Sequence, residues 1–167
     1  KPQERLMKGR VFMNIGILVY SHTGNTQSVA ERLVKAAKTQ GHKAVIETIQ
    51  IAPNDPNVSD SVLISPPSPL PYDRLVFASP VHGFRMSRAM KLYLDQIPDL
   101  AGRKAACFVT HFFPFAWMGG SGTVKAIAKA VSAKSAPVAF TGVINWKNKK
   151  REEGIESMIA ALLSALA

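Results

Sequence analysis

The sequence predicts an α/β fold in which helices cover both faces of a five-stranded parallel sheet. Five short apolar runs alternate with segments of helical periodicity. Most of these runs are apolar on both faces, as strands are when helices lie on both sides of a parallel sheet. The alternation of strand and helix indicates a doubly wound topology. The runs span residues 11–20, 44–50, 74–79, 104–110 and 137–145.

Four further segments carry apolar residues at helical spacing and are predicted to be the helices of this fold. Ser87 is placed to cap the second of them, and Pro98 to end it. Glu152 and Glu153 would lie in the first turn of the fourth, where carboxylates suit the positive end of the helix dipole. The four stripes are Val29, Leu33, Ala36 and Ala37; Met90, Tyr93, Leu94 and Ile97; Val124, Ile127, Ala128 and Val131; and Ile155, Ile159, Leu162, Leu163 and Leu166.

One connection departs from the regular alternation. Residues 51–72 hold six of the eleven prolines where a crossover helix would be expected. Proline at this density excludes a regular helix, so an extended or 3₁₀ excursion across the sheet is predicted. A linker between two domains is the competing interpretation, but about 50 residues before it are too few for an independent α/β unit.

Length and composition are those of one globular domain. The 167 residues are 47% hydrophobic and 19% charged, which excludes a disordered chain. No apolar run reaches the roughly 18 residues that a membrane-spanning helix needs. Residues 1–10 are expected to be an N-terminal extension or a remnant, and residues 11–167 the single domain. The one cysteine, Cys107, excludes an internal disulfide, is expected to be an inert core thiol, and fits a reducing cytoplasm.

The net charge of +10 raises nucleic acid as a possible partner. The 21 basic residues are scattered, however, and only Lys147–Arg151 (KNKKR) form a run. Because no aromatic residues interleave that run and no nucleic-acid motif is present, a solvated basic face is favoured over a nucleic-acid surface.

Residues 20–33 (YSHTGNTQSVAERL) leave the first apolar run through a turn made almost wholly of hydrogen-bonding groups. Ser21, Thr23, Asn25 and Thr26 offer donors without charge, and the following helix points its N-terminal amides at the same place. This pattern favours a phosphate cradle. Neither GxxxxGK[ST] nor GxGxxG is present, which excludes a nucleoside-triphosphate P-loop and a dinucleotide fingerprint. A polar capping turn without a ligand is the alternative.

The stretch LVYSHTGNTQSVAERL resembles the phosphate loop of flavodoxins, in the shorter Y-S-x-T-G-N-T form. PYDRLVFASPVHGFRMSRAMKLYLDQ resembles the third strand and first flavin-ring loop of that family, and GRKAACFVTHFFPFAWMGGSGTVKAI the fourth strand and second ring loop. The resemblance covers roughly residues 13–166. It implies a flavodoxin-like sheet of strand order 2-1-3-4-5 and FMN as the cofactor.

The residues themselves agree with this resemblance. His22, His82 and His111 follow the first, third and fourth strands, whose loops converge at one edge in that strand order. Aromatic residues gather in the same loops and would suit a flat isoalloxazine ring. Glycines there would let the backbone approach the ring. The cofactor-binding residues predicted on both grounds are Ser21, His22, Thr23, Gly24, Asn25, Thr26, Ser79, Pro80, Val81, His82, Gly83, Phe84, Thr110, His111, Phe112, Phe113, Trp117, Gly119 and Gly120.

Several functions remain open at this point. An electron carrier that shuttles electrons between redox partner proteins is favoured. An FMN-dependent reductase of a small acceptor, such as a quinone or nitro compound with NAD(P)H or a protein donor, is the alternative. The three histidines also permit a zinc or iron site, although the loops lack carboxylate and thiolate ligands. A binding module without a cofactor is the third class.

The predicted flavin loops contain no Asp or Glu, unlike the acidic surroundings usual in flavodoxins. Arg85 and Arg88 follow the middle loop. Because a nearby positive charge stabilises an added negative one, a flavin potential less negative than that of acidic flavodoxins is expected. The same charge predicts redox partners with an acidic docking surface.

Overall fold

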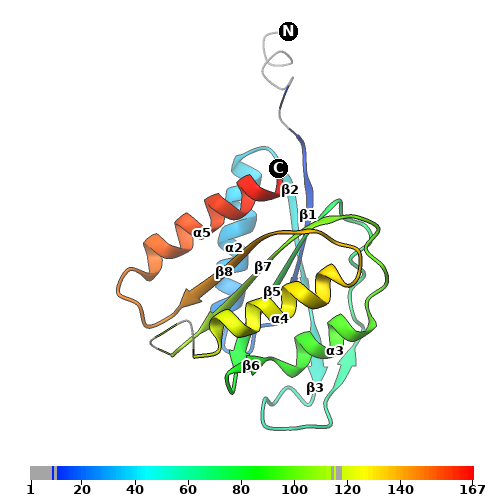
Figure 1. Cartoon of the computed structure of the whole chain (residues 1–167), viewed down its shortest axis with the longest axis vertical. Coiled ribbons are helices and arrows are strands. Elements are labelled where there is room, and N and C mark those ends of the chain that lie inside the picture. The colour runs from blue at the N-terminus through cyan, green and yellow to red at the C-terminus, as the bar shows by residue number, and fades with distance from the viewer. Residues whose placement is uncertain (1–8, 10, 114, 116–117) are drawn as a thin grey trace.

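The computed structural model of the chain describes residues 9, 11–113, 115 and 118–167. Its centre is a parallel sheet in the spatial order β2-β1-β5-β7-β8, which is the predicted order 2-1-3-4-5 (Figure 1). A further short strand, β6 (Arg85–Met86), pairs antiparallel with the end of β5. The five parallel strands are β1 (Asn14–Val19), β2 (Lys43–Thr48), β5 (Arg74–His82), β7 (Lys104–His111) and β8 (Val138–Asn145).

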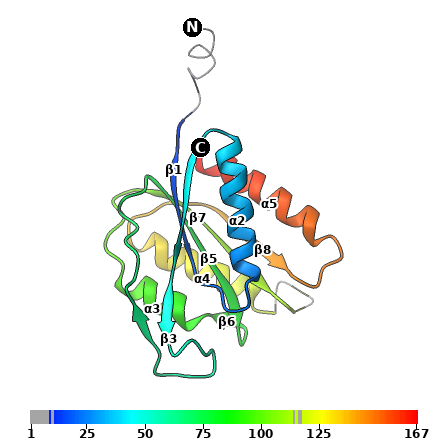
Figure 2. The same ribbon diagram turned by 180° about the vertical axis from the view of Figure 1, so that it is seen from behind.

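Helices cover both faces of this sheet, as predicted. Helices α3 (Arg88–Gln96) and α4 (Gly120–Ser132) lie on the face turned to the viewer in Figure 1. Helices α2 (Asn25–Thr39) and α5 (Arg151–Leu166) lie on the opposite face, seen in Figure 2. None of the described helices is both long and apolar enough to cross a membrane.

Strand β7 shows why the predicted strands are apolar throughout. Its successive side chains point to opposite faces. Ala106 and Phe108 therefore pack in the core beneath α2 and α5, whereas Cys107 and Val109 pack beneath α3 and α4. Cys107 is fully buried, and burial raises the pKa of its thiol to about 12, as expected of an inert core residue.

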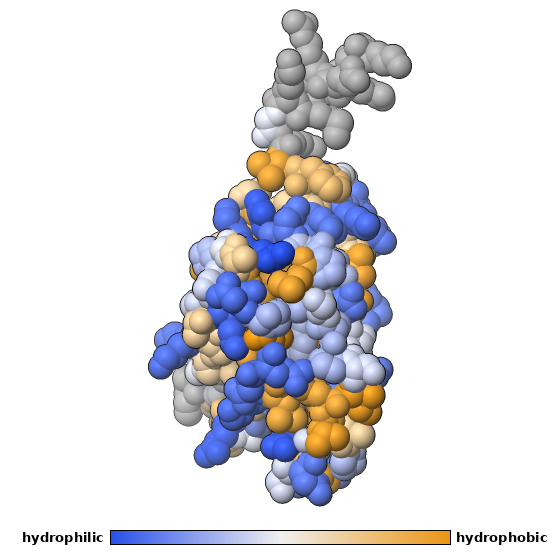
Figure 3. All heavy atoms as spheres, turned by 90° about the vertical axis from the view of Figure 1, so that its right-hand side faces the viewer, coloured by the Kyte–Doolittle hydropathy of each residue, from blue (hydrophilic) through white to orange (hydrophobic). Residues whose placement is uncertain are grey.

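The proline-rich connection contains no helix anywhere in residues 51–72, all of which the structure describes. Instead, β3 (Gln50–Ala52) and β4 (Val62–Ile64) form a separate two-stranded antiparallel sheet that the sequence did not predict. Val62 and Ile64 leave apolar side chains exposed on β4. Apolar residues gather at the lower end of the face in Figure 3, the end where Figure 1 places this hairpin.

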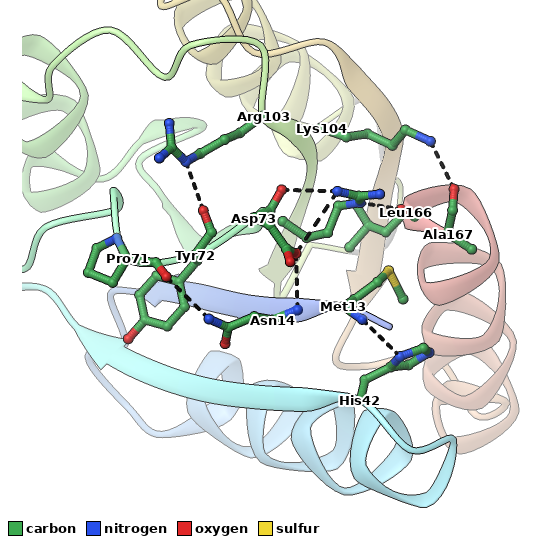
Figure 4. A network of polar contacts seen from close by, with 11 residues as sticks. Met13, Asn14, His42, Pro71, Tyr72, Asp73, Arg103, Lys104, Leu166 and Ala167 are labelled. Atoms are coloured by element: carbon green, nitrogen blue, oxygen red, sulfur yellow. Dashed lines mark hydrogen bonds and ion pairs between the residues drawn. The ribbon is translucent and has the colours of Figure 1, made fainter. Parts of the chain in front are cut away.

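At the amino-terminal ends of the strands, a network of hydrogen bonds links β1 to the segments that precede β5 and β7 (Figure 4). Asp73 accepts a hydrogen bond from the backbone of Asn14 at 3.0 Å, and Asn14 donates to the carbonyl of Pro71 at 3.2 Å. Arg103 donates through Nε to the carbonyl of Tyr72 at 2.8 Å. His42 accepts from the backbone of Met13 and so lies at this end, away from the other three histidines. The opposite, carboxyl end carries the predicted site.

Candidate functional site

The first loop turns sharply between β1 and α2. The Ser21 hydroxyl oxygen accepts hydrogen bonds from the backbone of Gly24 and of Gln27, both at 3.2 Å, and thereby fixes the turn. Gly24 has φ 96°, a left-handed conformation that favours glycine. Within the described residues, the backbone N–H groups of Asn25 and Thr26 have no acceptor. The start of α2 thus presents open donors and the positive end of its dipole.

One of the four predicted side-chain donors, Thr26, is already engaged inside the protein. Thr26 is buried, and its hydroxyl shares a hydrogen bond of 2.8 Å with that of Thr110 at the end of β7. This hydrogen bond joins the start of α2 to the carboxyl end of β7. His22 and Thr23 are exposed and Asn25 is half-buried, so these three side chains remain accessible at the turn.

The second predicted loop is shorter than expected. Strand β5 was predicted to end at Ser79, but it continues to His82 because β6 provides it with an antiparallel partner. Ser79 is fully buried and hydrogen-bonds the hydroxyl of Ser87 at 2.7 Å, so it lies away from the surface. Pro80 and Val81 belong to the strand as well.

Only Gly83 and Phe84 form the tip of this β5–β6 hairpin. Their φ angles are 53° and 63°, which places both in the left-handed region that a tight hairpin turn requires. Phe84 is 53% exposed at the tip. The hairpin therefore presents one accessible aromatic side chain rather than a flexible loop.

The predicted histidines do not form one cluster. The rings of His22 and His82 meet edge to face with centroids 5.9 Å apart, and Tyr20 contacts His82 in the same manner at 6.0 Å. Burial lowers the pKa of His82, and the neighbouring His22 lowers it further. His111 is 3% exposed, and burial lowers its pKa. Among the described residues, neither of its ring nitrogens has a hydrogen-bond partner.

A metal site of three imidazoles is not supported. In the part of the chain that the structure describes, no three His, Cys, Asp or Glu side chains lie close enough together to hold one metal ion.

The two predicted ring loops contact each other directly. Phe84 and Phe113 are stacked with centroids 4.3 Å apart and planes at 19°. Gly119 has φ 107°, and a Cβ atom there would lie 2.7 Å from Cα of Phe84, so the close approach requires glycine. Because the stacked rings touch, no third ring fits between them. Phe112 and Phe115, in the same loop as Phe113, are exposed. Gly120 begins α4, and Trp117 lies outside the described residues.

The surroundings of these loops are positively charged. Arg85 is exposed on β6. Arg88 donates to the carbonyl of Ser61 at 3.0 Å and so ties the start of α3 to the start of β4. No carboxylate forms an ion pair with either arginine among the described residues.

Asn54 also lies at the first loop, although the sequence did not predict it there. Tyr20 donates its hydroxyl proton to Oδ1 of Asn54 at 2.8 Å, which ties the first loop to the segment that follows β3. A cavity of about 280 Å³ lies between them and is lined also by Ser21 and Ile64. No local signal in the sequence could place Asn54 here, because it lies in the irregular connection.

The strand order reverses between β1 and β5, so the first loop and the hairpin tip flank the switch point of the sheet, the usual place for a ligand. The chain has the flavodoxin-like fold. Solved structures with this fold align over nearly their whole length. The Streptococcus pneumonia TIGR4 flavodoxin matches with a TM-score of 0.65 and 14% identity, over 90% of this chain and 97% of its own.

Two further solved structures agree. The flavodoxin of Megasphaera elsdenii gives a TM-score of 0.61 and 21% identity, over 89% of this chain and 98% of its own. The Trp repressor binding protein of Bacillus subtilis gives 0.58 and 16%, over 91% and 97%. No protein-family model and no curated protein matches the chain. At these identities the flavodoxin-like likeness is one of fold.

Proposed function

We propose that this chain binds FMN at the carboxyl ends of β1, β5 and β7 and serves as an electron-transfer protein. The observation that carries the proposal is the turn between β1 and α2. Its open N–H groups on Asn25 and Thr26 lie at the switch point of a flavodoxin-like sheet, with no acidic residue in the first turn of α2. A helix start of this kind is a ready site for a phosphate dianion.

The donor set fits the phosphate of FMN. Exposed Thr23 and half-buried Asn25 can add side-chain donors to the backbone amides, and the fixed Ser21 retains its own hydroxyl proton for a ligand. A single phosphate suits this turn, and a pyrophosphate fingerprint is absent from the sequence, so FMN is favoured over FAD.

The aromatic pair limits how the ring of FMN can be held. With Phe84 and Phe113 in contact, the isoalloxazine can lie against the exposed side of Phe84, but it cannot insert between the two rings. A position of the ring between the two loops is therefore possible only if the loops separate. The predicted role of Trp117 as a cofactor-binding residue stays a prediction.

A bound flavin would supply the electron chemistry, since it accepts and donates one or two electrons. The chain's own contribution is to hold the phosphate at α2 and to cover part of the ring with Phe84. His82, whose lowered pKa keeps it neutral near pH 7, adds a polar but uncharged neighbour to the first loop.

The surface around the proposed site favours a protein partner. Phe84, Phe112 and Phe115 are exposed together with the positive charge of Arg85, a combination that suits an apolar contact surrounded by acidic residues. We therefore favour a carrier that docks acidic redox proteins in the cytoplasm. A reductase of a quinone or nitro compound is the second candidate, and the experiment below separates the two.

The test begins with the purified protein and FMN. Quenching of flavin fluorescence and a shifted visible spectrum, stronger with FMN than with riboflavin or FAD, would support the proposal. Absence of saturable FMN binding would contradict it. Anaerobic titration of the FMN complex with dithionite, then with NADH and NADPH, separates the candidates: bleaching by dithionite alone supports the carrier, whereas rapid bleaching by a nicotinamide supports the reductase.

A further inference from the structure

Strand β8 has an outer edge that no other strand covers. Within the described residues it is the last strand of the sheet and pairs only with β7. Helices α4 and α5 both contact it, and Figure 1 shows it between them at one side of the sheet. We propose that an extended acidic segment of a partner protein adds to this edge as a further strand.

The main-chain groups of Thr141 and Val143 point away from β7. The backbone of Trp146 donates to the carbonyl of His111 at 2.7 Å, so the main-chain groups of Trp146 face β7. Because these groups alternate between the two sides of a strand, those of Thr141 and Val143 face outward. Their N–H groups have no acceptor in the part of the chain that the structure describes. They are therefore free to pair with an incoming strand.

Most of this edge lacks the features that usually prevent pairing, which are lysine, proline and bulges. The register with β7 shifts between Val138 and Phe140, and Pro137 precedes the strand, so both features lie at its start. The remaining residues of β8, 140–145, include no charged residue and no proline. Thr141 is exposed, so neither flanking helix covers its side chain.

The charge of the surrounding segment favours an acidic occupant. Residues 100–151 form β7, α4, β8 and the turn to α5, and they hold nine of the 21 basic residues and none of the 11 acidic ones. Lys125 and Lys129 are exposed on α4, and three further lysines are exposed in the turn after β8. Such cations attract the carboxylates of an incoming segment and steer it to the surface.

The carboxylates of α5 neutralise little of this charge, because two of the three are paired with α2. Glu152 lies 2.6 Å from the guanidinium of Arg32, and Glu156 lies 3.9 Å from it. Among the described residues, Glu153 is the one carboxylate of α5 without an ion pair. The edge of β8 is therefore flanked by an excess of positive charge.

The same charge disfavours two other arrangements. A second copy of this chain on β8 would bring two carboxylate-free segments together, and like charges repel. The opposite edge of the sheet, β2, suits an acidic segment less well. It carries Glu47, and Asp55 and Asp60 lie in the connection that follows it.

The inference goes beyond the proposed flavin site and does not require FMN. At its carboxyl end, β8 places Asn145 opposite His111 of β7. The loop that follows His111 carries the exposed Phe112 and Phe115. A segment on β8 therefore lies next to the apolar surface proposed for a redox partner, and one acidic partner can contact both.

The test is an NMR titration of the full chain with a peptide of alternating glutamate and valine, blocked at both ends and as long as the eight residues of β8. We expect saturable shifts of the amides of Thr141 and Val143, and slower hydrogen exchange of both in the complex. The same peptide methylated on every backbone nitrogen keeps its charge but has no N–H donor. It should bind at least about tenfold more weakly, because its hydrogen bonds to the edge are lost.

Charge is tested separately from main-chain pairing. A peptide with lysine in place of glutamate should not bind. The double variant Lys147→Gln, Lys149→Gln should bind the glutamate peptide about threefold more weakly at low salt and equally at high salt, because exposed charges are screened. The matched control is Lys35→Gln, Lys38→Gln on α2, which packs over β1 and β2 and should leave binding unchanged.

The inference is overturned if the methylated peptide binds as tightly, if the shifts do not saturate, or if both double variants weaken binding equally. A short single-stranded RNA that binds more tightly, without shifting Thr141 and Val143, would instead identify a nucleic-acid surface. Shifts of these two amides that grow with protein concentration, without peptide, would assign the edge to a second copy. The titration is run with and without FMN, whose binding flavin fluorescence reports, so failure of the flavin proposal and failure of this one are distinguishable.

Discussion

The side chain of Ser21 fixes the shape of the turn at which we propose that phosphate binds. Its oxygen accepts hydrogen bonds from the backbone N–H groups of Gly24 and Gln27. These bonds hold the turn in the shape that leaves the N–H groups of Asn25 and Thr26 open. The accessible donors are then Thr23 and Asn25, since Thr26 is engaged with Thr110.

The double variant Thr23→Ala, Asn25→Ala should therefore weaken FMN binding by about 1–3 kcal/mol for each charge-assisted contact that is lost. Fluorescence titration measures the affinity, and riboflavin, which lacks the phosphate, should bind both proteins equally. Thr39→Ala at the other end of α2 is the matched control. Equal FMN affinity in wild type and double variant would show that this turn does not hold the phosphate.

The lowered pKa of His82 predicts that the free energy of unfolding depends on pH. Its pKa is lowered from 6.5 in the folded protein, by burial first and by His22 second, so the unfolded chain binds the proton more readily. The free energy of unfolding is then unaffected by this group above pH 6.5 and decreases as the pH falls from there through the folded pKa.

Urea denaturation between about pH 7.5 and about pH 5.5 tests this dependence, with NMR titration of the His82 ring as a direct measure. His82→Gln should flatten the decrease, and His22→Gln should move the folded pKa of His82 upward. His111, whose pKa burial also lowers, contributes in the same direction and will keep the profile of His82→Gln from becoming flat. A ring of His82 that titrates above 6.5 would contradict the prediction.

At the residue scale, the sequence predicted contacts that are local and missed those that are distant. The capping role of Ser87 was predicted and is confirmed: its hydroxyl oxygen accepts from the backbone of Met90 at 3.2 Å. The hydrogen bonds between Thr26 and Thr110 and between Tyr20 and Asn54 join residues 84 and 34 positions apart. Such pairs depend on how elements pack, which spacing along the chain does not reveal.

Among the elements, the packing of the proline-rich connection on the sheet depends on Gly16 in β1. A Cβ atom on this residue would overlap the ring of Tyr72, which is held in place by hydrogen bonds from its own hydroxyl to Glu47 and from Arg103 to its carbonyl. The connection therefore requires a glycine at this position of β1.

Gly16→Ala is expected to lower the free energy of unfolding by about 1–3 kcal/mol, the usual effect of overpacking a core. Chemical denaturation measures this. Gly122→Ala, in the first turns of α4 where a Cβ meets nothing within 4 Å, is the control and should be neutral or stabilising. A Gly16→Ala protein as stable as wild type would mean that Tyr72 moves aside without cost.

The sequence predicted the bounds of an element correctly only where a local signal, such as a group of prolines, marks them. Proline density correctly excluded a helix from residues 51–72, because proline removes a donor and clashes within a helix. The end of β5 was placed too early, because its last residues are held by β6, a strand of two residues that gives no periodic signal. The hairpin of β3 and β4 is missed for the same reason, since strands of three residues are too short to show alternation.

For the whole molecule, the net charge of +10 is expected to raise the reduction potential of a bound flavin. Positive charge favours the added electron, so the reduction potential of the second electron should be less negative than in acidic flavodoxins. Because exposed charges are screened, the difference should shrink as salt is added.

Redox titration at low and high ionic strength tests the charge effect, with Arg85→Ala as the variant. The potential should become more negative in this variant, and by less at high salt. Arg88→Ala is a less clean probe, because Arg88 also holds the carbonyl of Ser61 and its loss loosens the β3–β4 hairpin. Lys129→Ala, in the last turn of α4 and away from the loops, is the control. A low potential that neither salt nor Arg85→Ala shifts would contradict the charge argument while leaving the FMN site intact.

The interior position of β1, between β2 and β5, has a consequence for how the chain is made. On one side β1 pairs with β2, where Asn14 lies opposite Lys43, but on the other it pairs with β5, where Ile15 lies opposite Arg74. A nascent chain leaving the ribosome therefore completes β1, α2 and β2 while one edge of the buried strand β1 is still without a neighbour. Folding to the native sheet must await the synthesis of β5, and a fragment that ends before residue 74 should remain unfolded and be prone to aggregation.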